Sequence, residues 1–141
     1  MSGVLTADDL GADALGERAT IVQVSSAFCA PCRAARTVAA RVTGTSEGVA
    51  HLEVDVAGHE QLAERLRVTA TPTVLVLDRH GRVRHRLEGV PRLAWLRTSV
   101  EDAGRVDREP GRVFREPGRV DREPGRADRE PGPLFEGTDS P

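Results

Sequence analysis

The chain has 141 residues and a formal net charge of -2, with 20 Lys and Arg residues against 22 Asp and Glu residues. This length is sufficient for one domain of ordinary size with its own core. The near-neutral charge gives no electrostatic reason to expect binding to nucleic acid or to an anionic membrane surface, and without a run of about 18 apolar residues no segment is expected to span a membrane.

The N-terminal segment lacks the basic start and apolar run of a secretory signal. We therefore expect the protein to act in the cytoplasm, a reducing compartment. In such a compartment, cysteines are more often catalytic or metal-binding than structural crosslinks. The sequence contains two cysteines, Cys29 and Cys32, and their spacing directs the search for function.

Residues 1–103 alternate strand and helix signals and are expected to form one domain. Apolar runs and helical spacing of apolar residues predict the elements in chain order: strand 20–25, helix 31–42, strand 50–56, a short helix around 62–66, strand 73–77, a tight turn at His80-Gly81, strand 82–88, and a last helix beginning at Pro91. Strand–helix alternation closed by a hairpin predicts an α/β fold, in which helices cover both faces of a mixed β-sheet.

From Gly104 the chain repeats a heptapeptide as GRVDREP, GRVFREP, GRVDREP and GRADREP, four copies ending at Pro131. A seven-residue period suggests a coiled coil, but a proline inside a helix costs about 3 kcal/mol and each copy contains one. The few apolar residues cannot offset the chain entropy. We predict a disordered tail over 104–141. An array of partner-binding sites is the alternative interpretation of the repeats.

The segment Cys29-Ala30-Pro31-Cys32 lies where a predicted strand gives way to a predicted helix. A cysteine at a helix N-terminus meets unpaired N–H groups and the positive end of the helix dipole, which favour its thiolate over the free thiol with a pKa of about 8.5. Pro31 suits the first helical position. Cys32, one turn on, points back under Cys29, and Arg33 and Arg36 add positive potential. The spacing predicts an attacking Cys29 and a resolving Cys32.

Two other interpretations of this cysteine pair are weaker. A structural zinc site needs four ligands, but the chain has no second cysteine pair, and its four histidines are scattered over different predicted elements. We therefore expect no metal. A purely structural disulfide closing so short a loop would restrain the unfolded chain little. Thiol–disulfide exchange is the favoured chemistry.

Several separated motifs resemble the thioredoxin family over about residues 4–103. They are Phe28-Cys29-Ala30-Pro31-Cys32-Arg33, the acidic strand end Glu53-Val54-Asp55, the segment Val68-Thr69-Ala70-Thr71-Pro72-Thr73, and the late glycine Gly89. The resemblance implies a thioredoxin-like fold, reduction of protein disulfides without a bound cofactor, and regeneration by an NADPH-dependent flavoprotein reductase. We expect a monomer acting on disulfide-containing client proteins.

The resemblance also implies a substrate groove beside the cysteines. The Thr71–Pro72 bond is expected to be cis and to pack against the disulfide, although roughly one X–Pro bond in twenty is cis in folded proteins. A trans proline that merely begins the strand is the alternative. Because a proline has no N–H to donate to a neighbouring strand, the backbone of Thr71 is expected to be free to pair with an extended client segment. The residues expected to line the groove are Phe28, Ala30, Pro31, Thr71, Pro72 and Gly89.

The chain departs from the family at two places. Gln23 replaces a buried Asp thought to help deprotonate the resolving cysteine, and His51 replaces a lysine opposite it. Since glutamine cannot accept a proton at neutral pH, we consider His51 beside Gln23 either as a weak base with a pKa near 6.5 or as a neutral core histidine. The second departure is Ser25-Ser26, with Phe28 in place of the usual Trp, which alters the rim around Cys29 and so the choice of substrate.

The expected reaction is attack of the Cys29 thiolate on a client disulfide, followed by displacement of the reduced client by Cys32. Arg33, Gln23 and His51 are expected to tune the pair. Two alternatives stay open on the sequence alone. One is a thioredoxin-fold binding module whose cysteines turn over slowly or not at all. The other is a net oxidant or isomerase, because the reduction potential depends on thiolate stabilisation.

Overall fold

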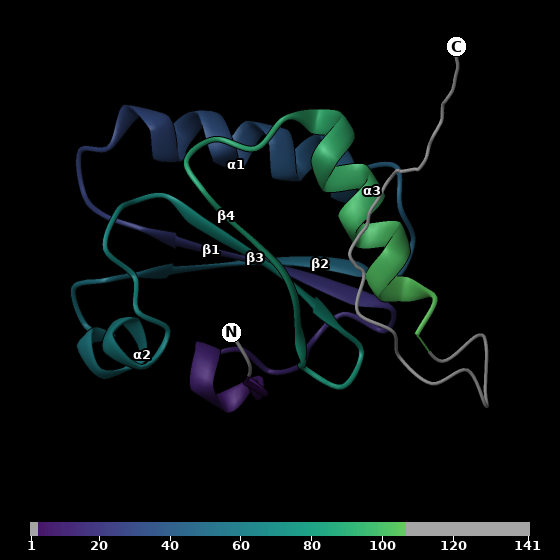
Figure 1. The fold of residues 1–141 in the computed structure, drawn as a ribbon, viewed down its shortest axis with the longest axis horizontal. Helices are drawn as coiled ribbons and strands as arrows, with labels where there is room; N and C mark the ends of the chain where they lie inside the picture. The colour runs from purple at the N-terminus through teal and green to yellow at the C-terminus, as the bar shows by residue number, and fades with distance from the viewer. Residues whose placement is uncertain (1–2, 107–141) are drawn as a thin grey trace, which may run out of the picture. The chain divides into compact units, whose positions relative to one another are not determined.

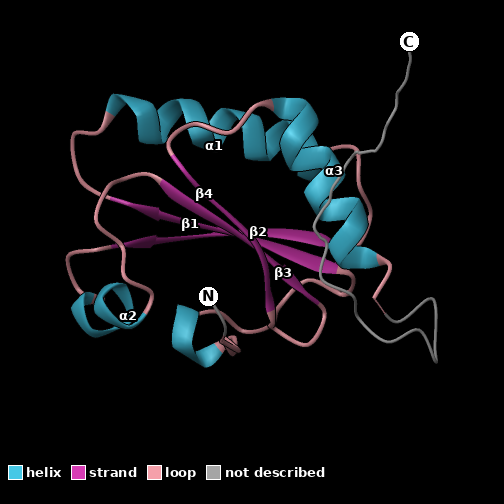
Figure 2. Cartoon of the chain, in the orientation of Figure 1, coloured by secondary structure: helices cyan, strands magenta, loops and turns pink. Residues whose placement is uncertain are grey.

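The structure, a computed structural model, describes residues 3–106. Its strands and helices follow the predicted order (Figures 1 and 2): β1 Ala19–Ser25, α1 Ala30–Thr43, β2 Val49–Asp55, α2 Glu60–Arg65, β3 Thr73–Asp78, β4 Val83–Glu88 and α3 Leu93–Gly104. The predicted ends of these elements are each within two residues of the observed ones. The largest differences are at the starts of two helices: α2 begins two residues before Leu62, and α3 begins two residues after Pro91.

The sheet has four strands in the order β2-β1-β3-β4. β1 and β2 run parallel, whereas β3 is antiparallel to both β1 and β4. This arrangement confirms the predicted mixed sheet. Every residue of the two central strands, β1 and β3, is buried, because helices cover both faces.

The two faces of the sheet have separate hydrophobic cores. Figure 1 shows α1 and α3 on one face and α2 with the N-terminal segment on the other. Alternate residues of β1 supply the two cores: Ile21 packs in the cluster with α1 and α3, and Val22 in the cluster with Leu5, Leu10 and Leu66. Gln23 follows the same alternation and points to the α1 face, and this places a polar side chain directly under the cysteine motif.

The turn between β3 and β4 is confirmed at His80-Gly81. Gly81 has φ +85°, a backbone conformation that residues with a side chain rarely adopt. Its N–H donates to the carbonyl oxygen of Asp78 at 2.9 Å. A Cβ at this position would lie 2.0 Å from the carbonyl oxygen of Leu5. The turn therefore needs glycine both for its dihedral angle and for the close approach of the N-terminal segment.

Two features of the fold, one near the N-terminus and one in β4, were not predicted. A short 3-10 helix, Asp8–Leu10, precedes β1 and buries Leu10. The alternating arginines of β4 are also less exposed than the strand pattern indicated. The Arg84 guanidinium donates to the fully buried Asp78 carboxylate at 2.9 Å, and Arg86 donates to the carbonyl oxygens of Leu66 and Arg67. These arginines hold the hairpin and the end of α2 in place.

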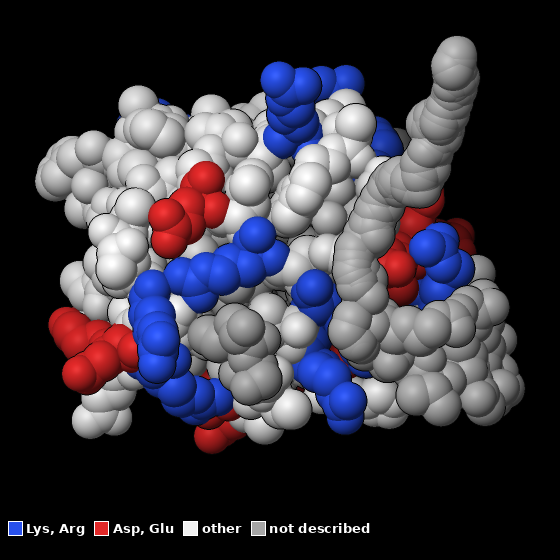
Figure 3. Space-filling view, in the orientation of Figure 1, with Lys and Arg blue, Asp and Glu red and all other residues white. Residues whose placement is uncertain are grey.

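α3 ends at Gly104, and the structure describes two further residues. Apart from 104–106, the tail predicted as disordered over 104–141 lies outside the described residues. Within 3–106, no helix is both long and apolar enough to cross a bilayer. On the face seen in Figure 3, basic and acidic side chains lie interspersed.

Candidate active site

Cys29 is the N-cap residue of α1. Its backbone is extended, with φ -115° and ψ 103°, and its Sγ accepts a hydrogen bond from the backbone N–H of Cys32 at 3.1 Å. Pro31 lies in the first turn, where its missing N–H leaves no partner unsatisfied. The predicted position of Cys29 at the helix N-terminus is confirmed, and α1 extends for 14 residues behind it, so the sulfur lies at the positive end of a substantial helix dipole.

The two cysteines are joined by a disulfide, with their Cα atoms 5.2 Å apart. They differ in accessibility: Cys32 is 1% exposed, whereas Cys29 is half-buried. Phe28 is fully exposed beside Cys29 and has φ +55°, which is unusual for a residue with a side chain. An approaching disulfide therefore reaches the sulfur of Cys29 and not that of Cys32.

The loop before β3 lies against the disulfide. The Thr71–Pro72 bond is cis, as the resemblance predicted. The carbonyl oxygen of Thr71 lies 4.0 Å from Cys29 Sγ, and Gly89 donates its N–H to the carbonyl oxygen of Pro72 at 2.8 Å. The structure thus brings Thr71, Pro72 and Gly89 together beside Cys29. Within residues 3–106, the backbone of Thr71 has no backbone hydrogen-bond partner.

Gln23 connects the sheet to the first turn of α1. The side chain is fully buried, and its Nε2 donates to the carbonyl oxygen of Cys32 at 2.8 Å and to Ser25 Oγ at 3.0 Å. A carbonyl oxygen can only accept, so the amide nitrogen must face Cys32 and the amide oxygen must face the other way. Gln23 therefore acts as a hydrogen-bond donor toward the backbone of Cys32.

His51 lies beside Gln23, as predicted. Its Nε2 is 3.1 Å from Gln23 Oε1, and because that oxygen accepts, the His51 ring must carry its proton on Nε2. Burial lowers the pKa of His51 below 6.5, with the Glu53 carboxylate acting in the opposite direction. The ring is therefore neutral at pH 7. No hydrogen bond links it to the sulfur of Cys32 among the described residues, so the base role stays a prediction.

Sequence reasoning missed the hydrogen-bonding role of Glu53. Its carboxylate accepts from Ser25 Oγ at 2.7 Å and from Arg36 at 2.8 and 2.6 Å. The hydrogen bonds from Arg36 hold the pKa of Glu53 below its usual value, against the effect of partial burial. The parallel register of β1 and β2, which pairs Gln23 with Glu53, carried the missing signal. Arg36 was predicted only as a source of positive potential, and in the structure its guanidinium forms an ion pair with Glu53.

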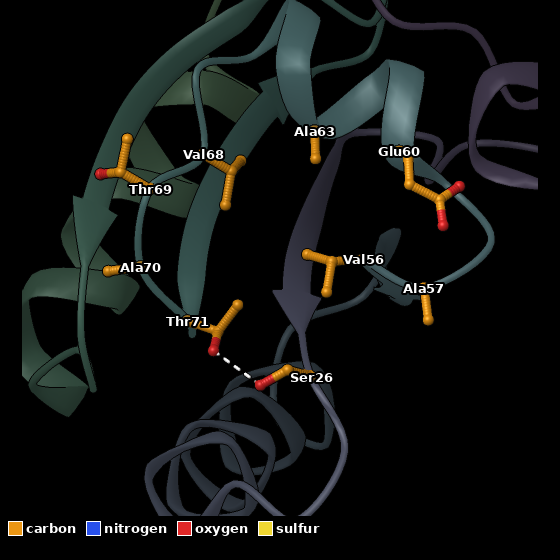
Figure 4. A pocket seen from close by; sticks show the side chains of 9 residues that line it. All are labelled: Ser26, Val56, Ala57, Glu60, Ala63, Val68, Thr69, Ala70 and Thr71. Carbon is orange, nitrogen blue, oxygen red and sulfur yellow. Dashed lines mark hydrogen bonds between the residues drawn. The ribbon is translucent and has the colours of Figure 1, made fainter.

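An apolar pocket of about 520 Å³ begins at the Thr71 loop. In Figure 4 the side chains of Val56, Ala63 and Val68 surround it, and a hydrogen bond of 2.8 Å between Ser26 and Thr71 closes one end. The pocket lies between α2 and the loop that carries Thr71. It is a place where an apolar side chain of a bound segment would be buried.

The remaining predicted site residues lie at the rim. Ala30, Pro31 and Arg33 are exposed on the first turn of α1. Within residues 3–106, no group of three or more His, Cys, Asp or Glu side chains is arranged to hold a metal ion. All eleven residues predicted for the site thus surround the disulfide or support it from below.

Comparison with known families decides the relationship. The family model described as Thioredoxin matches residues 5–102. The chain belongs to the thioredoxin family. The match spans the strands, the cysteine motif and the Thr71–Pro72 loop, so the resemblance seen in the sequence motifs is confirmed. No curated protein matches the chain significantly.

Solved thioredoxins share the fold at low sequence identity. A thioredoxin mutant from Halobacterium salinarum is 20% identical with a TM-score of 0.58, and the match covers 69% of this chain and 81% of that one. Oxidised mitochondrial thioredoxin 3 from Saccharomyces cerevisiae is 19% identical with a TM-score of 0.53, covering 61% and 79%. Oxidised thioredoxin from Plasmodium falciparum is 22% identical with a TM-score of 0.52, covering 62% and 83%. These structures support the thioredoxin fold.

Family membership and the Cys29–Cys32 disulfide together support thiol–disulfide oxidoreductase chemistry at this site, without specifying the substrate or the direction of electron transfer. The more exposed sulfur, that of Cys29, is at a helix N-terminus, the sulfur of Cys32 is buried one turn away, and the Thr71 backbone beside them has no backbone hydrogen-bond partner within residues 3–106. This is the chemistry that the thioredoxin motif predicted.

Proposed function

We propose that this chain reduces disulfides in client proteins. The observation that carries the proposal is the position of Cys29 Sγ, which accepts the Cys32 N–H at 3.1 Å at the start of α1. In the reduced protein the same N–H would hydrogen-bond to the Cys29 thiolate. Charge-assisted hydrogen bonds of this kind are stronger than neutral ones, and they favour the ionised form.

The reaction consists of two exchanges. The Cys29 thiolate attacks one sulfur of the client disulfide, which forms a mixed disulfide and releases the client's other sulfur as a thiolate that takes up a proton. Cys32, having lost its own proton, then attacks Cys29 Sγ and releases the second client sulfur. Two electrons pass to the client, and Cys29 and Cys32 end as the disulfide. The burial of Cys32 supports this order, because only Cys29 is accessible to a large substrate.

The client would bind as an extended segment. The unpaired backbone of Thr71 supports pairing with such a segment by added-strand hydrogen bonds. The exposed ring of Phe28 and the conformation of Gly89 leave the approach to Cys29 open. In this arrangement the apolar pocket between α2 and the Thr71 loop accepts a client side chain on the far side of Thr71 from the disulfide.

Regeneration of the dithiol is assigned to an NADPH-dependent flavoprotein reductase, on the resemblance to the family. Action as a monomer and a cytoplasmic location stay predictions. In the proposed cycle Arg33 tunes Cys29, while Gln23 and His51 hold the first turn of α1 from below.

Insulin reduction with dithiothreitol tests the proposal. We expect the full chain to accelerate precipitation of the insulin chains, and a Cys29→Ser variant to be no faster than dithiothreitol alone. A Cys32→Ser variant is the matched control: it keeps the attacking thiol and, when it is reduced, freed of dithiothreitol and mixed with insulin, is expected to accumulate a mixed disulfide that is detectable by mass.

Two outcomes would overturn the proposal. Precipitation by the wild-type chain at the background rate would favour a binding module. A reduction potential in the range of strong oxidants would assign the chain to disulfide formation instead. Both measurements use the same purified protein, so a folding failure is detectable by circular dichroism in the same sample.

A further inference from the structure

A second, polar pocket lies beside Cys29 and shares Ser26 with the apolar pocket. Its volume is about 410 Å³, within the range of about 300–1,000 Å³ typical of small-molecule sites. The side chains of Ser25, Ser26 and Ala27 are small and leave this space open. The residues that line the pocket are Ser25, Ser26, Ala27, Phe28, Cys29, Arg33, Arg36, Glu53 and Asp55.

Two of the charged side chains in this pocket are paired with each other, and two others are able to bind a ligand. Arg36 and Glu53 are paired by two hydrogen bonds. Arg33 is exposed, and within residues 3–106 its guanidinium has no ion-pair partner. Asp55 is exposed at the end of β2 and uses one carboxylate oxygen, Oδ1, to accept the Ala57 N–H at 2.9 Å. The pocket therefore offers one available cation and one available anion.

These charges select a ligand that carries both an anionic and a cationic group. A carboxylate of the ligand would bind the planar guanidinium of Arg33, and an ammonium group would bind Asp55 Oδ2. The sulfur of Cys29 is part of the same lining, so a disulfide within the ligand would lie beside the attacking atom. The exposed ring of Phe28 provides an apolar edge for the ligand's methylene groups.

We propose that the pocket formed by Ser25, Arg33, Asp55 and Cys29 binds small zwitterionic disulfides, of which cystine is the simplest, as substrates. The proposal rests on the proposed function, because it uses the same exchange at Cys29 and Cys32. The Cys29 thiolate attacks one sulfur of cystine and releases the first cysteine thiolate, which is protonated. Cys32 then releases the second cysteine, and the two electrons of the dithiol have passed to cystine.

Single-turnover oxidation of the pre-reduced full chain tests the inference with four disulfides. Cystine carries both charges, 3,3′-dithiodipropionate lacks the ammonium groups, cystamine lacks the carboxylates, and 2-hydroxyethyl disulfide is uncharged. Loss of protein thiols is followed at pH 7 by quenching with an alkylating agent and measuring mass. For each protein, every second-order rate constant is divided by the constant for 2-hydroxyethyl disulfide. This ratio corrects for any difference in the reactivity of the Cys29 thiolate between the wild type and the variants.

We expect the wild-type chain to favour cystine over the neutral disulfide by about tenfold, the factor given by about one charged hydrogen bond. Arg33→Gln should reduce this preference and slow dithiodipropionate, leaving cystamine unaffected. Asp55→Asn keeps the hydrogen bond to Ala57 and should slow cystine while speeding dithiodipropionate. Arg41→Gln and Asp13→Asn change exposed charges away from the pocket and should leave all ratios unchanged.

Two results have different meanings. Failure of 2-hydroxyethyl disulfide to oxidise Cys29 and Cys32 would overturn the proposed function itself. Oxidation by that neutral disulfide, with no preference for cystine and no effect of Arg33→Gln or Asp55→Asn on the ratios, would overturn the small-disulfide site alone.

Discussion

His51 donates its Nε2–H to the side-chain oxygen of Gln23 over 3.1 Å, and the amide nitrogen of Gln23 in turn donates to the carbonyl oxygen of Cys32 at 2.8 Å. The carbonyl oxygen of Cys32 can only accept, so the amide nitrogen of Gln23 must face it. The amide oxygen of Gln23 then faces His51, and His51 must be the donor. A polar chain thus runs from β2 through β1 to the buried cysteine's turn. Where the family usually places a buried Asp, this chain has a neutral amide fixed by its neighbours.

The variant Gln23→Glu keeps the size of the side chain but removes the donors that face Cys32 and Ser25. It also places a carboxylate where Nε2 now lies 3.4 Å from the Glu53 carboxylate. We expect a loss of about 3–5 kcal/mol in unfolding free energy at pH 8, the cost of an uncompensated buried charge. Chemical denaturation followed by circular dichroism measures it.

The pH dependence of that loss tests its cause. Burial and the neighbouring carboxylate raise the pKa of the introduced Glu above its unfolded value, so the folded variant binds the extra proton first and gains stability relative to wild type as the pH falls. Gln23→Leu is the control, since its deficit cannot narrow by protonation of the new side chain. A Gln23→Glu variant as stable as wild type at pH 8 would contradict the assigned amide orientation.

Replacement of His51 by Leu distinguishes between the two interpretations of this residue, a weak base and a neutral core histidine. The change leaves the buried Oε1 of Gln23 without a donor, and we expect a loss of about 1–3 kcal/mol. Because the ring hydrogen-bonds to Gln23 and is neutral at pH 7, we expect the rate at which Cys32 resolves a mixed disulfide to stay unchanged. Stopped-flow resolution of a mixed disulfide measures that rate. A marked slowing beyond the loss of stability would establish the weak-base role.

The wild-type protein should lose stability in acid in two stages. Burial lowers the pKa of His51 from 6.5, so the unfolded chain takes up a proton before the folded one, and stability falls as the pH drops below about 6.5. The lowered pKa of Glu53 has the same sign below its ordinary value of 4.5. Denaturation midpoints between pH 8 and pH 3 measure both. His51→Leu should flatten the first stage only, and stability that rises from pH 6.5 to pH 5 would contradict the shift.

Gly89 offers a test of backbone conformation without a steric complication. Its φ is +100°, yet a Cβ at this position meets no atom within 4 Å. We expect Gly89→Ala to cost about 1–3 kcal/mol through the backbone alone. Gly3→Ala is the matched control, because Gly3 also has open space but no positive φ. Equal stability of the two variants, measured by thermal unfolding, would contradict the strained conformation.

The local features of the site could be predicted from the sequence because they depend on neighbours in the chain. Cys29 at the start of a helix and Pro31 in the first turn follow from the order of residues in a short motif, whereas the cis bond at Pro72 was expected only from the resemblance to the thioredoxin family. The β1 and β3 strands were recognisable from uninterrupted apolar runs. The 3-10 helix at Asp8–Leu10 is too short to show any period, and it was missed.

The features that could not be predicted depend on which strands are neighbours. Glu53 meets Gln23 and Arg36 only because β2 pairs with β1 in parallel and in that register. Arg84 finds the buried Asp78 across a hairpin whose bulge lies between Val76 and Leu77. A strand pattern shows which residues share a face but not which side chain lies opposite, so the polar pocket beside Cys29 was recognisable only in three dimensions.

The most direct test of the redox assignment is the ionisation of Cys29. In a Cys32→Ser variant, which keeps the N–H that faces Cys29 Sγ, thiolate absorbance in the ultraviolet is followed from pH 4 to pH 10, with the double serine variant as baseline. A Cys29 pKa well below the value of about 8.5 for a free thiol is the expected result. A pKa at or above that value would show that the helix N-terminus does not stabilise the thiolate, and would contradict the proposed function.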